Sequence, residues 1–365
     1  MRRLTEEFAF SLRKRFGIGA NGSGKDVVVV CSTGQPVLPA AWYGIIAAGG
    51  VVSSASASFT PFELARQLRA GGGNVLICSE DVAPAARNAI KELGNEQKVT
   101  LLILRSEPDF SLRIDGQGRE GELRGEAATD RLTWERITDP KKLEESLIVL
   151  LYSSGTTGVP KGVMLSHLNL VAELTILTEP SREFIAKKMT EPGWENPPPQ
   201  RTLAHLPTAH IAGVTGYMIT PLFSGTLVYW MRKYNWQDFL RYNKEHRITT
   251  FYTVPSIYLR ISKDPDVKDH FKTLLAASTG AAKMDSALQT AANRKLGVGT
   301  TFIGQTWGLS ETTGAVTAMS IEMEPDESGS ISPVLPNVEV RLVDENDEVR
   351  SQPCESANAM RILTY

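Results

Sequence analysis

The stretch YSSGTTGVPKGVMLSH, residues 152–167, has the composition of a phosphate-binding loop. Its small residues leave backbone N–H groups accessible, its Ser and Thr hydroxyls add donors, and Lys161 adds a positive charge. Pro160 precedes the lysine and Gly162 follows it, so the spacing differs from that of a P-loop. By itself the stretch fits a nucleotide-hydrolysing switch, an enzyme that uses ATP to activate a substrate, a bare binding loop or a structural turn.

A second glycine-rich stretch, Gly19–Lys25, imitates a P-loop without its chemistry. Asp26 stands where a Ser or Thr hydroxyl should meet magnesium, and its carboxylate would repel phosphates. The pattern also predicts a helix before this stretch and a strand after it, whereas an anion site needs the opposite order. We therefore predict a turn between a helix and a strand.

The elements that must position these loops alternate between helix and buried strand. Leu4, Phe8, Leu12 and Phe16 have helical spacing and predict a helix within residues 1–19 that stops at glycine, and Thr60 with Pro61 opens another that ends at Gly71–Gly73. Strands are predicted at 26–32, 74–79 and 147–153, and the alternation resumes after residue 200. The order predicts an α/β fold with mostly parallel sheets. Residues 106–130 and 179–200 are polar and read as exposed loops.

Composition excludes several classes of function. The 39 basic and 41 acidic side chains give a net charge of −2, which predicts no attraction to nucleic acid or to an anionic membrane. Three scattered cysteines without CxxC spacing fit a reducing compartment and indicate no metal site of that kind. The longest early apolar run, VVVVC, is too short to span a membrane. We expect a soluble, cytoplasmic protein. Its final tripeptide, LTY, is not a peroxisomal address, although a peroxisomal location stays open for a full-length relative.

Three further segments, in order, accompany the first loop. They are LAHLPTAHIAG (203–213), ASTGAAKM (277–284) and IGQTWGLSETTG (303–314). Together the four segments resemble the signatures of the adenylate-forming superfamily, the AMP-dependent synthetases and ligases. The apolar strings look most like the acyl-CoA synthetase and 4-coumarate–CoA ligase branch. The resemblance implies a large N-terminal domain of two α/β/α subdomains with mostly parallel sheets and a small β region.

The resemblance also implies roles for individual residues. His210, Ser310 and Glu311 would be catalytic; Glu311 with Thr156 would hold Mg²⁺; and His210, Tyr252, Gly280 and Gly304 would border the acid. Residues implied to bind ATP are Ser153, Ser154, Gly155, Thr156, Thr157, Gly158, Lys161, Gly280, Ala281, Ala282, Gln305, Thr306, Trp307, Gly308 and Ser310. Of these, Trp307 would stack on adenine and Ser310 would bind the α-phosphate. His205 is expected to be a core histidine.

The resemblance runs from about Leu4 to Glu345. We therefore expect residues 1–345 to form the AMP-binding domain, incomplete at its N-terminus, and residues 346–365 to be an unmatched tail. The family's TGD element, its hinge and the C-terminal lid domain with its catalytic lysine are not found in this sequence, so we expect impaired adenylation.

The function implied is activation of a carboxylic acid by ATP and transfer of the acyl group to CoA, with Mg²⁺ as cofactor. A non-catalytic nucleotide-binding remnant and an adenylation domain that loads a carrier protein stay open. The acid stays open too: aryl-propenoates, medium-chain fatty acids and precursors of secondary metabolites all fit, since one methylene changes binding by only ~1–3 kcal/mol.

Overall fold

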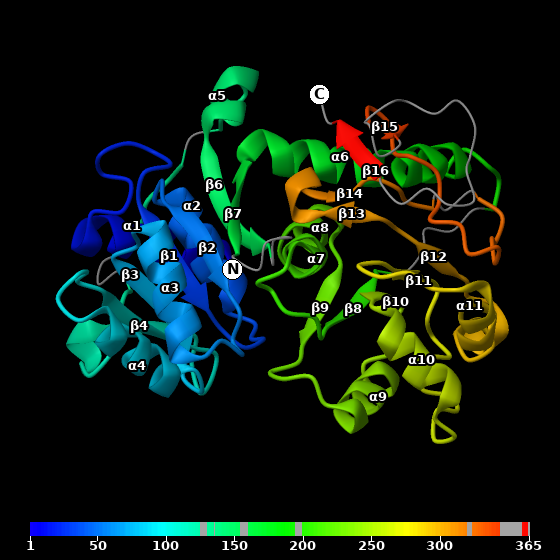
Figure 1. Ribbon diagram of the computed structural model, residues 1–365, viewed down its shortest axis with the longest axis horizontal. Coiled ribbons are helices and arrows are strands. Elements are labelled where there is room, and N and C mark those ends of the chain that lie inside the picture. The colour runs from blue at the N-terminus through cyan, green and yellow to red at the C-terminus, as the bar shows by residue number, and fades with distance from the viewer. Residues whose placement is uncertain are drawn as a thin grey trace. The chain divides into compact units, whose positions relative to one another are not determined.

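The computed structural model describes residues 1–124, 130–134, 136–153, 160–193, 199–319, 323–343 and 360–363 (Figure 1). The chain forms two compact units: unit 1 is Met1–Val171 with Pro199–Thr249, and unit 2 is Ala172–Pro198 with Thr250–Tyr365. Both units contain parallel strands connected by helices, so the expected α/β class is confirmed.

The centre of unit 1 is a seven-stranded sheet in the order β5–β4–β3–β1–β2–β6–β7. Its inner pairings are parallel, whereas β5 and β7 run antiparallel to their neighbours at the two edges. The strands are β1 (Val27–Cys31), β2 (Val51–Ala55), β3 (Val75–Ser79), β4 (Thr100–Arg105), β5 (Ser111–Ile114), β6 (Leu147–Ser153) and β7 (Lys161–Ser166).

Alternate residues of β1 build the two cores of unit 1, because successive side chains of a strand point to opposite faces. Val28 and Val30 pack in one core with side chains of α1 and α2, and Val29 and Cys31 pack in the other with side chains of α3 and α4. The helices are α1 (Arg2–Phe16), α2 (Leu38–Ala47), α3 (Pro61–Gly71) and α4 (Ala83–Leu93). The seven-stranded sheet is thus covered by helices on both faces.

The predicted start of α3 is confirmed by its cap. The Glu63 N–H donates to the Thr60 hydroxyl at 3.3 Å, and the Thr60 N–H donates to the Glu63 carboxylate at 2.8 Å. This reciprocal pair satisfies two N–H groups that the first turn leaves free. The predicted turn at residues 19–25 is confirmed as well, since the Asp26 carboxylate accepts the Gly19 N–H at 2.7 Å between α1 and β1.

The remainder of unit 1 carries a parallel two-stranded sheet, β8–β9, and short helices. The strands are β8 (Arg201–Ala204) and β9 (Leu227–Trp230), and the helices are α5 (Pro140–Glu145), α7 (Ile211–Gly213), a π-helical turn (Val214–Ile219), α8 (Thr220–Ser224) and α9 (Trp236–Glu245). Helix α6 (His167–Lys188) follows β7 and continues into unit 2.

Unit 2 is built on a three-stranded parallel sheet in the order β10–β11–β12. Its strands are β10 (Thr250–Thr253), β11 (Ala276–Thr279) and β12 (Ile303–Gln305), and its helices include α10 (Pro255–Lys263) and α11 (Ser286–Asn293). Two antiparallel pairs follow, β13 (Gly308–Leu309) with β14 (Gly314–Ala315), and β15 (Glu339–Leu342) with β16 (Met360–Leu363).

Both segments predicted to be loops contain regular structure, so those two predictions are wrong. In the first, β5 pairs with β4 because the fully buried Leu112 completes the core under a strand too short for a clear sequence pattern. In the second, α6 continues past Pro180 to Lys188, through a run of good helix formers. Within the described part of the chain, no helix is both long and apolar enough for a membrane span.

Candidate functional site

The carboxyl ends of β10, β11 and β12 meet at one edge of the unit 2 sheet. The register aligns Tyr252 with Ser278 and Gly304, and Thr253 with Thr279 and Gln305. In open α/β sheets, ligands bind at the carboxyl ends of the parallel strands. Five of the predicted site residues lie at or directly after this edge: Tyr252, Gly280, Gly304, Gln305 and Thr306.

Gly280 is packed too tightly for any side chain. A Cβ atom at this position would stand 2.5 Å from the Tyr252 hydroxyl and 2.7 Å from the Thr306 carbonyl oxygen. The Thr306 N–H donates to the Thr279 carbonyl at 2.8 Å, which brings the chain after β12 against the chain after β11. Burial raises the pKa of Tyr252 to about 12, so its hydroxyl remains protonated. The edge therefore presents bare backbone beside a phenol.

The next two residues present little more than backbone. Ala281 has φ +66°, a left-handed conformation that is uncommon for a residue other than glycine, and both Ala281 and Ala282 are exposed. Such strained positions cluster at functional sites. A planar ring could approach this turn closely, as predicted for adenine.

A tight hairpin follows β12 and carries the remaining predicted groups. Gly308 pairs with Ala315, and Leu309 pairs with Gly314. Ser310–Thr312 form the turn between them. A Cβ at Gly308 would lie within bonding distance, 1.7 Å, of the Gly314 carbonyl oxygen, so only glycine fits. The Trp307 N–H donates to the Thr317 hydroxyl at 2.9 Å, which fixes the base of the hairpin.

Ser310 and Glu311 lie at the tip of this hairpin. Ser310 is half-buried and Glu311 is exposed. Mg²⁺ commonly uses one or two carboxylates together with substrate phosphates and water, rather than a cage of protein ligands. A single accessible carboxylate beside a hydroxyl therefore fits a magnesium ion that arrives with a nucleotide.

Two predicted residues have partners inside the protein. The buried Gln305 side chain donates to the Gln289 side chain at 3.2 Å, and its carbonyl accepts from the Ser332 hydroxyl at 2.5 Å. Gly304 lies against the Met319 side chain, whose Cβ would be 3.1 Å from an added Cβ. The ligand contacts proposed for Gln305 and Gly304 stay predictions. The side-chain amide and the backbone carbonyl of Gln305 already have partners within the protein.

In unit 1 the phosphate loop connects β6 to β7. Ser153 and Lys161 are directly opposite each other in this antiparallel pair, so both ends of the loop are held together. Lys161 is exposed, and among the described residues the buried Ser153 hydroxyl has no hydrogen-bond partner. The predicted residues Ser154, Gly155, Thr156, Thr157 and Gly158 lie outside the described residues.

The two histidines after β8 differ as predicted. His205 is buried, its Nδ1 lies 2.8 Å from the Leu203 carbonyl oxygen, and burial lowers its pKa to about 4. His210 is exposed and caps α7, with its Nδ1 accepting the Ala212 N–H at 3.2 Å. Partial desolvation lowers the pKa of His210. In its neutral form the proton is then on Nε2, which can donate to a carboxylate.

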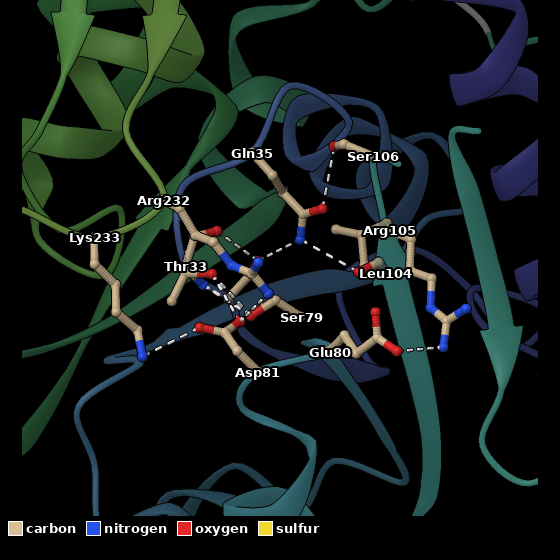
Figure 2. A network of polar contacts seen from close by, with 11 residues as sticks. Thr33, Gln35, Ser79, Glu80, Asp81, Leu104, Arg105, Ser106, Arg232 and Lys233 are labelled. Carbon is tan, nitrogen blue, oxygen red and sulfur yellow. Dashed lines mark hydrogen bonds and ion pairs between the residues drawn. The ribbon is translucent and has the colours of Figure 1, made fainter. Parts of the chain in front are cut away.

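A polar network at the carboxyl ends of β1 and β3 was missed by the sequence analysis (Figure 2). Asp81 accepts from the Thr33 hydroxyl at 2.9 Å and pairs with Lys233 at 3.3 Å and Arg232 at 3.7 Å. Burial alone would raise the pKa of Asp81, but hydrogen bonds from Ser79 and Thr33 and the two cations lower it. The network connects the segment after β9 to the seven-stranded sheet. No motif in the local sequence indicates it.

Known proteins resemble this chain in sequence over most of its length. A protein of Emericella nidulans named as an acyl-coenzyme A synthetase is 42% identical over 351 residues, which are 96% of this chain and 61% of that protein. 4-Coumarate–CoA ligase 2 of Solanum tuberosum is 26% identical over 357 residues, which are 94% of this chain and 60% of that protein. The chain thus spans about three fifths of the length of these curated relatives.

Solved structures share the fold. A long-chain-fatty-acid-CoA ligase from Archaeoglobus fulgidus superposes with a TM-score of 0.73 at 17% identity, covering 97% of this chain and 64% of that one. The family model described as "AMP-binding enzyme" matches residues 1–355. The chain therefore belongs to the AMP-binding enzyme family, the adenylate-forming enzymes that include the acyl-CoA synthetases.

Proposed function

We propose that this protein activates a carboxylic acid with ATP and transfers the acyl group to CoA. In the first step a carboxylate oxygen attacks the α-phosphorus of ATP, the bond to the bridging oxygen of pyrophosphate breaks, and an acyl-adenylate forms. In the second step the CoA thiol loses its proton, sulfur attacks the acyl carbon and AMP leaves. AMP is a far better leaving group than the oxide of a carboxylate, which is why the first step is needed.

The packing at Gly280 is the observation that carries this proposal. Gly280, buried against Tyr252 and Thr306, and the exposed, left-handed Ala281 form a turn of small residues at the carboxyl edge of the unit 2 sheet. Trp307 lies two residues after the end of β12, which pairs with β11. A turn of small residues with an adjacent indole suits a planar purine, which binds by stacking.

The hairpin supplies groups for the reacting phosphate. Ser310 is proposed to donate a hydrogen bond to an α-phosphate oxygen, and Glu311 to hold Mg²⁺, which would neutralise charge on the phosphates when bound. Donors fixed before the reaction stabilise developing charge without reorganising. In unit 1, Ser153 and Lys161 are proposed to bind the pyrophosphate part of ATP, and Nε2 of His210 to orient the acid.

The comparisons support the reaction class without naming the acid. The relatives' names include both an acyl-coenzyme A synthetase and 4-coumarate–CoA ligases, and the first of these names specifies no acid. Because the chain spans about three fifths of the length of these relatives, the activity of the whole protein is part of the proposal. Tyr252 and Gly304 are the pocket residues in unit 2 whose substitution we expect to change acid preference.

Acid-dependent exchange of labelled pyrophosphate into ATP tests the first step. We expect exchange with at least one acid from a panel of aryl-propenoates and medium-chain fatty acids, and its loss in Glu311→Ala. Glu324→Ala, a change at an exposed residue away from the hairpin tip, should exchange like the wild type.

The other outcomes separate the alternatives. Binding of MgATP without exchange for any acid would indicate a nucleotide-binding remnant and contradict the ligase. Exchange followed by acylation of a carrier protein, but not of CoA, would indicate a carrier-loading adenylation domain.

A further inference from the structure

Helix α6 carries a buried carboxylate that the proposed chemistry does not use. Glu173 is only 6% exposed, and burial raises its pKa to about 7 against the opposing effect of a hydrogen bond from the Ala315 backbone. A carboxyl group in such surroundings is costly unless it is hydrogen-bonded. Its partners therefore indicate what the residue does.

Glu173 holds the second strand of the hairpin. The Ala315 N–H donates to its Oε1 at 2.7 Å. Gly314 packs its backbone against the same oxygen, since a Cβ at Gly314 would stand 2.5 Å from Oε1. Gly314 has φ +148°, so glycine also suits the backbone there. The carboxyl group thus contacts both residues of β14.

Other hydrogen bonds shape the hairpin from within it, and the Leu335 N–H donates to the Val316 carbonyl at 2.9 Å, just after β14. The Leu309 N–H donates to the Thr312 hydroxyl at 2.9 Å, and the Val316 N–H donates to the Trp307 carbonyl at 2.7 Å. These bonds set the turn and its base. The bond from Glu173 is different, because it comes from a separate helix and fixes where β14 lies.

We infer that Glu173 is a positioning residue, whose hydrogen bond to β14 holds Ser310 and Glu311 in place for the α-phosphate and Mg²⁺. The inference rests on the proposed function. Ser310 and Glu311 lie in the turn between β13 and β14, so a displaced β14 moves both of them. Trp307 and Gly280 precede the hairpin, and the residues that hold Trp307, Val316 and Thr317, lie just after β14. We therefore expect the proposed contact of Trp307 and Gly280 with adenine to change less than the positions of Ser310 and Glu311.

Loss of the Glu173 carboxylate should therefore weaken the binding of MgATP but not that of adenosine. Glu173→Met keeps the length of the side chain and removes the acceptor. We expect it to bind adenosine like the wild type but to bind MgATP roughly tenfold more weakly, the usual effect of one lost hydrogen bond to a charged group. Glu173→Gln retains a side-chain oxygen that accepts the Ala315 N–H, so it should recover most of the MgATP affinity. Glu183→Ala, an exposed position on the same helix, is the matched control.

The experiment is calorimetric titration of each variant with adenosine and with ATP plus Mg²⁺. Equal MgATP affinity in Glu173→Met and the wild type would overturn the inference, as would an equal loss of adenosine and MgATP affinity. Should Glu173→Met fail to fold, Glu173→Asp replaces it, because its carboxylate is one methylene short of β14.

A measurement without ligand separates this inference from the proposed function. Hydrogen–deuterium exchange of a peptide covering 308–317 should be faster in Glu173→Met than in Glu173→Gln or Glu183→Ala. If the wild type binds neither adenosine nor MgATP, the proposed function fails, whereas unchanged exchange in Glu173→Met overturns the positioning role by itself.

Discussion

The Gly280 backbone lies directly against the Tyr252 side chain, so that a Cβ on Gly280 would stand 2.5 Å from the tyrosine hydroxyl oxygen. The two residues come from neighbouring parallel strands, β10 and β11, and meet where both strands end. Because real Cβ atoms do not approach other atoms this closely, the smallest possible substitution at Gly280 tests the geometry of the edge.

Gly280→Ala should destabilise unit 2 and disturb the proposed adenine site. The added methyl must displace the Tyr252 hydroxyl and the Thr306 carbonyl, and overpacking of this kind costs about 1–3 kcal/mol in free energy of unfolding. We expect adenosine affinity to fall as well. Urea denaturation and calorimetry measure the two effects.

Gly216→Ala is the matched control, since a Cβ there meets no atom within 4 Å. Combining Gly280→Ala with Tyr252→Phe should restore part of the lost stability by removing one of the two clashing atoms. If Gly280→Ala unfolds like Gly216→Ala and binds adenosine unchanged, the edge is not packed as described.

Trp307→Ala should weaken adenosine binding by about 1–3 kcal/mol, the range observed for bases that stack on aromatic side chains. Trp307→Tyr retains a stacking ring and should lose much less. Calorimetric titration with adenosine measures both. An alanine variant that binds adenosine as tightly as the wild type would remove Trp307 from the proposed site.

The fold was largely readable in the sequence, because helical periodicity and runs of β-branched residues are local signals. The helix predicted within residues 1–19 is α1, and the strands predicted at 26–32 and 147–153 are β1 and β6. Strand β5 and the second half of α6 were missed for physical reasons. A four-residue edge strand shows its pattern only through the partner it pairs with, and the second half of α6 is polar and contains Pro180, so its residues resemble a loop.

The candidate site, like the fold, was predictable only where its residues are contiguous in the sequence. Motifs that are continuous in the sequence, such as residues 280–282 and 307–311, could be found, and the structure brings their elements to one edge of unit 2. Glu173 and Asp81 act through contacts with residues far away in the chain, Ala315 and Lys233, so no spacing rule identifies them.

The stability of unit 1 should depend on pH through His205. Burial lowers its pKa to about 4 from the ordinary value of 6.5, so the fold favours the neutral ring. The associated stability is fully present above pH 6.5 and is lost as the pH falls from 6.5 towards 4, by about 3 kcal/mol.

Two non-titrating variants, His205→Gln and His205→Phe, isolate this effect. Each variant will have its own free energy of unfolding at pH 7.5. Between pH 6.5 and pH 4, the free energy of unfolding of the wild type should fall relative to that of each variant by the same amount, about 3 kcal/mol. Urea denaturation across this range measures it, and a pH-independent difference in both variants would show that His205 does not titrate in this way.

Magnesium-dependent binding of ATP tests the central claim most directly. Calorimetric titration with ATP, with Mg²⁺ and with EDTA, should show at least roughly tenfold tighter binding with Mg²⁺, equal to ~1.4 kcal/mol. Glu311→Gln should lose that increment and keep its adenosine affinity, while Glu324→Gln behaves like the wild type. Absence of ATP binding, or a magnesium increment that survives in Glu311→Gln, would contradict the account.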